Sequence, residues 1–386
     1  MKDPQYTWDL ESVFPGGSSS PELHKQLDTV RAKTAALKKQ VEMLTPELSV
    51  EQLKTLVYDM QDVQIHLGQC SAFVGCLTAQ DVRDDQAKLL QGDLGQISAS
   101  LAGVFTAIDH IFVSIPEERW KAFLEDTELK ELAFSLNERR DVARTKMSPE
   151  LEALVTDLEI DGYHAWSHLY YTIVGEMSIE MELDGKPQTL SMGQAANLLS
   201  NPDPNVRKEV FQKYEAAWAE KAELFASTLN HLAGFRINLY KNRGWDDVLS
   251  EPLQRNRMER ATLDAMWGAV QGGKPYLAKF LERKAELLGL DQLAWYDLGA
   301  PVGDAGREIP FPEAKAFVVD QFRKFSPEIA DFTQRALDKR WVEAENRGGK
   351  RPGAFCTSFP LTKESRVFMT YSGTISSLGT LAHELG

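Results

Sequence analysis

An apolar stripe with the period of an α-helix runs through the first part of the chain and is the strongest constraint on its fold. Ser20 and Pro21 can start the first of these helices. A second apolar stripe begins at Leu53, and a third runs over about 85–113. Long amphipathic helices with short connections pack as antiparallel neighbours, so residues 1–115 are predicted to form an N-terminal helical bundle. The first stripe consists of apolar residues three or four positions apart, interrupted by Thr34: Leu23, Leu27, Val30, Leu37, Val41 and Leu44.

The pattern changes near residue 177, where "MSIEMEL", a turn at Asp184-Gly185 and "KPQTLS" predict a β-hairpin over about 177–191. Helical patterns then resume. One helix is predicted over about 204–242 and another over about 259–288, with a kink or break at Gly272-Gly273; two more begin at Pro312 and at Ser326-Pro327.

The last forty residues are aromatic and rich in β-formers. "AFCTSF" and "RVFMTYS", separated by "PLTKES", predict two strands, and a helix is predicted from about Thr374 to the end. We expect Ile375, Leu378, Ala382 and Leu385 to face the core, with His383 near the edge of that stripe. The fold class expected is mostly α: an elongated multi-helix body with the N-terminal bundle, the hairpin near 177–191 and a small β-sheet beside the terminal helix.

The chain ends on "HELG", the first four letters of H-E-x-x-H, at His383 and Glu384. Two histidines four apart on a helix can bind one zinc ion, and the glutamate after the first can take a proton from the metal-bound water. A His-Glu pair alone is weak evidence, because an exposed or capping histidine near a helix end is the commoner case. The preceding residues decide the interpretation.

The segment "GAFCTSFPLTKESRVFMTYSGTISSLGTLAHELG", residues 353–386, resembles the thimet-oligopeptidase/oligoendopeptidase F family of zinc metallopeptidases. In that family a Gly-Ala/Gly-Phe-Cys segment, a strand ending in Asn/Tyr-x-Gly-Thr, and T-L-x-H-E-x-G-H follow one another. Softer matches occur in order at "YTWDLESVF", "LSNPDPNVRKEVFQKY" and "WYDLGAPV". The likeness covers essentially the whole chain, and the oligoendopeptidase F branch fits best.

The resemblance implies a zinc-dependent oligoendopeptidase that hydrolyses internal bonds of short unstructured peptides in a deep channel between two halves. It makes His383 the first zinc ligand and Glu384 the general base. The second histidine and the later glutamate ligand match nothing in this chain, so the chain by itself is expected to be inactive and to bind zinc weakly or not at all. The expected domains are the bundle at 1–115, a helical connector with the hairpin at 116–200, and an incomplete catalytic domain at 201–386. The alternative is a non-catalytic helical scaffold that binds peptides or a partner.

Composition limits the partners and the compartment. A net charge of −14 disfavours nucleic acid and anionic membranes, and no run approaches a membrane-spanning length of apolar residues. Three cysteines and an N-terminus without a secretory pattern favour the cytoplasm. If the chain is a fragment, helices around Pro312–Asn346 should expose apolar surface, and self-association is expected.

Several further features are interpreted as structural. His164 and His168 lie four apart but lack the following glutamate, so a packed aromatic helix is favoured over a zinc site. Cys356 is expected to be a buried thiol, and "RGGKRPG" at 347–353 a flexible basic loop. One of the two C-terminal strands could expose an edge that binds an extended peptide by strand addition; the sequence does not say which strand, or whether other structure covers the edge.

Overall fold

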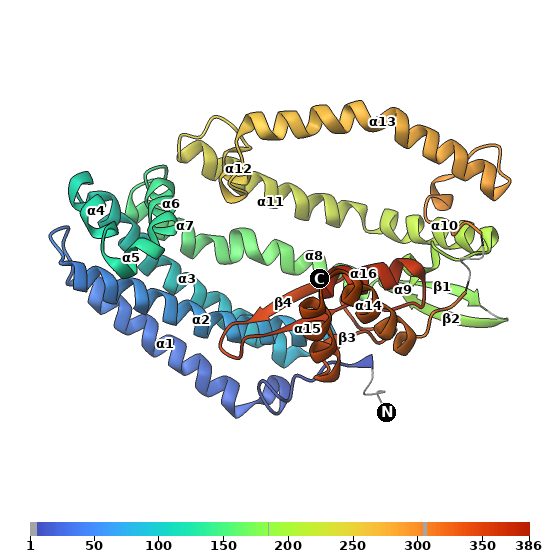
Figure 1. The fold of residues 1–386 in the computed structure, drawn as a ribbon, viewed down its shortest axis with the longest axis horizontal. Coiled ribbons are helices and arrows are strands. Elements are labelled where there is room, and N and C mark those ends of the chain that lie inside the picture. Colours follow the sequence, from blue (N-terminus) through green and yellow to red (C-terminus); the bar gives the residue numbers. More distant parts are fainter. Residues whose placement is uncertain (1–5, 184, 304–306) are drawn as a thin grey trace. The chain divides into compact units, whose positions relative to one another are not determined.

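A computed structural model describes residues 6–183, 185–303 and 307–386 (Figure 1). The chain forms two compact units: a helical unit of residues 9–168 and 357–366, and a mixed unit of residues 1–8, 169–356 and 367–386. Helices dominate both, and the described strands form one two-stranded and one three-stranded sheet. The predicted mostly α fold class is confirmed, whereas the division at 115 and 200 stays a prediction.

The helical unit is built on the apolar stripes that the sequence predicts. The Ser20 hydroxyl accepts a hydrogen bond from the Leu23 amide and caps α1, and Thr34, which interrupts the stripe, is buried on the same face. Helices α1, α2 and α3 pack against one another side by side (Figure 1). The helices of this unit are η2 (Gly17–Ser19), α1 (Pro21–Glu42), α2 (Val50–Gln80), α3 (Asp85–Ser114), α4 (Glu117–Leu124), α5 (Thr127–Glu131), α6 (Ala133–Ala143), α7 (Pro149–Glu159) and η3 (Ile160–His164).

Helix α3 corrects the expectation that no segment is apolar enough to span a membrane. It contains an 18-residue window with a mean hydropathy of 1.5, which is sufficient by length and composition. Core helices of soluble proteins have the same property, and α3 packs against α1, α2, α6 and α7 through a stripe that includes Leu90, Leu94 and Leu101. The apolarity of α3 is therefore weak evidence for a membrane span.

The mixed unit begins within α8 (Ala165–Glu176) and continues into the predicted hairpin of β1 (Ser178–Leu183) and β2 (Lys186–Ser191). The strands are antiparallel, with Met181 opposite Gln188, and Gly185 has a φ of 73°; Asp184, the other predicted turn residue, lies outside the described residues. The remaining elements before the second sheet are α9 (Met192–Leu198), α10 (Pro204–Glu220), α11 (Ala222–Asn242), α12 (Ser250–Arg255), α13 (Arg260–Leu288), η4 (Trp295–Asp297), α14 (Phe311–Phe325) and α15 (Pro327–Asp338).

Two predictions about the long helices are wrong. The single helix expected over 204–242 is divided into α10 and α11 at Lys221. The break lets the rings of Trp218 and Phe225 pack against each other with centroids 4.7 Å apart and planes tilted by 39°, whereas seven residues of a continuous helix would separate them by about 10 Å along the axis. The break offered for α13 is the second error, because the helix continues through Gly272 and Gly273 (Figure 1); the kink offered as the alternative stays a prediction.

The core of the mixed unit lies where strand β3 (Val342–Glu343) and the end of strand β5 (Glu364–Phe368) meet α14, α15 and the C-terminal helix. Strand β5 lies between β3 and β4 (Phe355–Phe359), and it runs parallel to β3. The strands β4 and β5 and the helix α16 (Ile375–Leu385) confirm the predicted elements; β3, with two residues, was not predicted. The buried cluster of this core consists of Phe311, Ala314, Val318, Ala336, Trp341, Val342, Ala344, Val367, Met369, Tyr371, Leu381 and Leu385.

The expected exposure around Pro312–Asn346 is found only in part. Helices α14 and α15 bury one face each, which includes Phe311 and Ala330, while Phe317 and Phe325 are 50 % and 84 % exposed. Self-association through such side chains stays a prediction.

A buried ion pair joins two segments that are distant in sequence. Arg207 of α10 donates to Asp297 of η4 at 2.7 Å, and both side chains are almost wholly buried. The same guanidinium donates to the carbonyl oxygens of Asn201 and Pro202, and the Asp297 carboxylate accepts from the Ala294 amide. The pair therefore fixes the loop before α10 against the turn after α13.

We predict that Asp297→Ala lowers the free energy of unfolding of the mixed unit by about 3–5 kcal/mol, because the Arg207 charge is left buried without its partner. The matched control is Asp264→Ala, which removes the exposed pair between Arg260 and Asp264 and should cost less than about 0.5 kcal/mol. Urea unfolding followed by hydrogen exchange in α10 measures both. Equal losses in the two variants would contradict the structural role of the buried pair.

Candidate active site at the C-terminal helix

The start of α16 is fixed by a cap and by a glycine. Thr374 is the N-cap, and its side chain and that of Ser377 bond each other's backbone amides in a capping box. Gly373, directly before the cap, has a φ of +73°, and its carbonyl oxygen accepts from the Ile309 amide at 2.8 Å. A Cβ at this position would lie 2.7 Å from the Glu308 Cγ. Glycine is therefore required both by the backbone conformation and by the neighbouring side chain.

Tyr371 ties the end of β5 to the same junction. Its hydroxyl donates to the Ile309 carbonyl at 2.8 Å, and its amide donates to the Ala344 carbonyl at 3.0 Å. Burial raises the pKa of the Tyr371 phenol to about 12, so it remains a hydrogen-bond donor at neutral pH.

One face of α16 packs against the core, and the opposite face is exposed. Leu381 and Leu385 are buried, and Leu378 and Ala382 pack against the same cluster. The expectation that Ile375 faces the core is wrong, since its side chain is 55 % exposed. Leu381 is buried in the core instead. His383 is exposed and Glu384 is half-buried, and the exposed face of the helix also carries Ser376 and Gly379.

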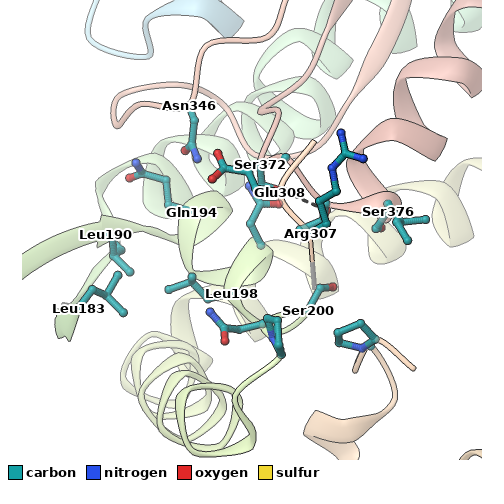
Figure 2. Close-up of a pocket in the computed structure, with 18 of the residues that line it drawn as sticks. Leu183, Leu190, Gln194, Leu198, Ser200, Arg307, Glu308, Asn346, Ser372 and Ser376 are labelled. Atoms are coloured by element: carbon teal, nitrogen blue, oxygen red, sulfur yellow. Dashed lines mark hydrogen bonds between the residues drawn. The ribbon is translucent and has the colours of Figure 1, made fainter. Parts of the chain in front are cut away.

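A cavity of about 690 Å³ lies at the other end of α16, within the mixed unit. Figure 2 shows Leu183, Leu190 and Leu198 on one side of it and Arg307, Glu308 and Ser376 on the other. Its polar lining includes Gln194, Asn197, Asn201, Asn346, Ser372 and Thr374.

His383 and Glu384 are not among the residues that line this cavity. Ser376, which does line it, precedes His383 by seven residues on the same exposed face, a distance of about 10 Å along the helix axis. The polar lining was not identified from the sequence. Its residues come from separate loops and helices, with no local motif to mark them.

The end of α16 carries side chains of the types that could hold part of a zinc site. His383 offers an exposed imidazole, the donor type that zinc prefers, with a carboxylate next to it. Among residues 6–183, 185–303 and 307–386, no three or more His, Cys, Asp or Glu side chains come close enough together to hold a metal ion. A complete zinc site of three protein ligands cannot be assembled from these residues.

The basic segment at 347–353 is anchored, which corrects its interpretation as a flexible loop. Lys350 is 5 % exposed, and its ammonium lies 3.0 Å from the buried Glu343 of β3. It also donates to the carbonyl oxygens of Glu345 and Met369 at 2.8 and 2.7 Å. Burial lowers the pKa of Lys350 to about 8, although Glu343 acts in the opposite direction. The segment therefore fastens the loop before β4 to the middle of the sheet.

The other histidine and cysteine candidates belong to elements other than α16. His164 ends a π-helical turn beside Glu159, and His168 follows on α8, where burial lowers the pKa of its imidazole. Cys356 is exposed on β4, so the prediction of a buried thiol is wrong; at this position of an edge strand the side chain points away from the core.

The order of the strands in the sheet decides which of the two predicted C-terminal strands lies at an edge. Strand β5 has neighbours on both sides, so its edges are occupied, whereas β4 is an edge strand. Cys356 and Ser358 of β4 are exposed, while Phe359 is buried. The strand that could add an extended peptide is therefore β4 and not β5.

Two family models match the chain. One, described as Oligopeptidase F, matches residues 112–178, and the other, described as Peptidase family M3, matches residues 197–386. Together they cover most of the connector, most of the residues that line the cavity, the three-stranded sheet and α16, whereas residues 179–196 lie between the two matches.

Individual relatives extend the match to nearly the whole chain. Oligopeptidase PepF of Bacillus subtilis is 25 % identical over 386 residues, which is 98 % of this chain and 56 % of the relative. An oligoendopeptidase F homolog of Lactococcus lactis is 20 % identical over 98 % of this chain and 63 % of its own length. The chain thus spans about three-fifths of the length of these relatives.

Solved structures share the fold. A putative oligoendopeptidase F from Bacillus anthracis superposes with a TM-score of 0.75 at 17 % identity, over 93 % of this chain and 63 % of that one. A putative peptidase from Chlamydophila abortus superposes with a TM-score of 0.62 at 19 % identity, over 100 % of this chain and 64 % of that one.

The junction before α16 gives a prediction. Gly373→Ala should lower the free energy of unfolding by about 1–3 kcal/mol, because the new Cβ meets Glu308 in a left-handed backbone conformation. The matched control is Gly379→Ala, within α16 and with open space around it, which should raise stability by about 0.5–1 kcal/mol. Thermal unfolding of both variants checks the pair. A neutral Gly373→Ala would contradict the close approach of Glu308.

Lys350 gives a pH prediction. Between pH 8 and 10.5 the unfolded chain holds a proton that folded Lys350 has released, so the free energy of unfolding should rise with pH across this window, by about 3 kcal/mol at most. Below pH 8 folded Lys350 is charged, and the full cost of burying its ammonium group then lowers the free energy of unfolding. Carbon-13 NMR titration of labelled lysine side chains, with Lys350→Arg to assign the resonance, should give a midpoint near 8. A midpoint above 10 would contradict the burial.

Proposed function

This chain belongs to peptidase family M3, and on that premise we propose that it forms part of a zinc-dependent oligoendopeptidase that hydrolyses internal bonds of short peptides. The observation that carries the proposal is the His383–Glu384 pair on the outward face of a capped helix beside a small sheet, at the end of the segment matched by the Peptidase family M3 model.

In the proposed site His383 is one zinc ligand and Glu384 is the general base. Zinc in such a site acidifies the water molecule that it binds. The partly exposed carboxylate of Glu384, adjacent to the imidazole on the helix, is placed to accept a proton at that position and return it to a leaving amine. The other ligands would come from polypeptide beyond these 386 residues, since the described residues do not complete the set.

The edge of β4 is the proposed peptide-binding element. Main-chain hydrogen bonds along an edge strand hold an extended peptide whatever its sequence, and the exposed Cys356 and Ser358 leave that strand accessible. Such recognition suits an enzyme for short, unstructured peptides. Folded proteins present few free extended segments.

Partners and compartment follow from composition. The net charge of −14 supports a protein that does not bind nucleic acid or membranes, and the cysteine content supports a cytoplasmic location. The lack of nucleic-acid and membrane partners and the cytoplasmic location are proposals, as the zinc site is.

We predict that residues 1–386 with added Zn²⁺ leave an internally quenched peptide uncleaved. In a longer protein that adds a second histidine and a later glutamate ligand, cleavage is expected. There Glu384→Gln should lower kcat by about 10²–10⁴-fold with zinc retained, and His383→Ala should lose the zinc. Ser376→Ala, on the same exposed face two turns away, is the control and should remain active.

Metal-dependent cleavage by residues 1–386 alone would contradict the incomplete ligand set. Full activity in Glu384→Gln would contradict the general-base role. Peptide binding without cleavage in the longer protein would favour the alternative, a non-catalytic peptide-binding scaffold.

A further inference from the structure

Helix α13 leaves an apolar face almost entirely uncovered. Of its 29 residues, all of which the structure describes, Ala285 alone is buried. Figure 1 shows the helix as a long continuous element that follows α12. Seven of its large apolar side chains are between 38 % and 63 % exposed: Met266, Trp267, Val270, Leu277, Phe280, Leu281 and Leu287.

The exposed side chains form one stripe. Met266, Val270, Leu277 and Leu281 recur at steps of four and seven, which places them within about 60° of one another around the helix. Between Met266 and Leu281 the stripe is about 22 Å long. We refer to these four residues, together with Trp267 and Phe280 about 40° beyond the two margins of the row, as the α13 stripe.

A second apolar feature continues the stripe at the C-terminal end of the helix. A cavity of about 640 Å³ is lined by Leu281 and Ala285 of α13 and by Leu290, Leu293 and Trp295 of the following segment. Trp295 is 75 % exposed. Leu281 belongs to both features, so the stripe leads directly into the cavity.

Such a face is typical of a helix that is covered by another element. An isolated helix in water gains little from propensity alone, and most helical stability in proteins comes from packing of the apolar face. Monomeric proteins seldom expose contiguous apolar patches larger than a few hundred Å². The α13 stripe has the length and spacing of a helix–helix contact.

The comparisons offer a candidate for the element that covers it. The match to the Bacillus subtilis relative covers 98 % of this chain but 56 % of the relative. The match to the Chlamydophila abortus structure covers 100 % of this chain but 64 % of that one. Relatives with the same fold therefore carry a large further amount of polypeptide that must pack somewhere.

We propose that the α13 stripe and the adjoining cavity are the docking surface for a helical segment of the kind that makes up this additional polypeptide. The segment would present apolar side chains at helical spacing and fill the cavity beside Trp295. Polar side chains at the rim, among them Lys274 and Glu282, would remain in water. The inference concerns an interface and does not depend on the peptidase chemistry.

The test uses residues 1–386 and, as the probe, the part of Bacillus subtilis oligopeptidase PepF outside the match, prepared as a separate polypeptide. Binding should shift the fluorescence of Trp267 to shorter wavelengths, a change that is lost in Trp267→Phe. Val270→Glu combined with Leu277→Glu should weaken binding at least tenfold. Both side chains are exposed in the free chain, so the variant should fold like the wild type, as circular dichroism can verify.

The matched control is Lys279→Glu, which changes the charge by the same two units as the stripe variant. Lys279 is exposed and lies about 180° from Val270 around the helix, outside the stripe, so binding should change less than about twofold. Absence of binding, or equal loss in both variants, would overturn the proposal. A dimer of residues 1–386 that is broken by the stripe variant in analytical ultracentrifugation would also overturn it and assign the face to a second copy of the chain.

Discussion

Leu381 and Leu385 hold α16 against the sheet core, and the orientation of the candidate site follows from that contact. Successive helical residues are about 100° apart, so His383 lies about 200° from each leucine and must face away from the core when both are buried. Glu384 is about 100° from Leu385, which places it at the margin, where it is half-buried. Burial of two leucines, at about 1.5–3 kcal/mol each, fixes the rotation of the helix.

The position of α16 along its axis depends on the junction with β5. Tyr371 is bonded to Ala344 on one side and to Ile309 on the other, and Gly373 accepts from Ile309 two residues later. The buried Lys350–Glu343 pair braces the sheet from the loop before β4. Sheet, loop and helix start are thus connected by hydrogen bonds, which leaves few ways to displace His383 without disrupting the core.

The sequence predicted those parts that depend on local patterns. The caps at Ser20 and Ser326, the hairpin, the C-terminal strands and α16 all follow from neighbouring residues. It missed what depends on distant contacts: the break at Lys221 set by Trp218 and Phe225, the two-residue strand β3, the burial of Lys350 and the exposure of Cys356. For the site, a motif marked His383 and Glu384, whereas nothing local marked the cavity lined by Asn346 and Arg307.

The mixed unit has two unmet requirements of different physical kinds. The α13 stripe needs an apolar cover, which any helix of suitable spacing could provide. In the proposed zinc site, His383 would need further ligands at defined distances, which only a specific chain could provide. If one polypeptide meets both, docking on α13 raises the local concentration of the missing ligands around His383, and zinc binding in turn stabilises the docked state. The apolar contact would then supply affinity and the metal would supply specificity, so that neither requirement is satisfied fully without the other.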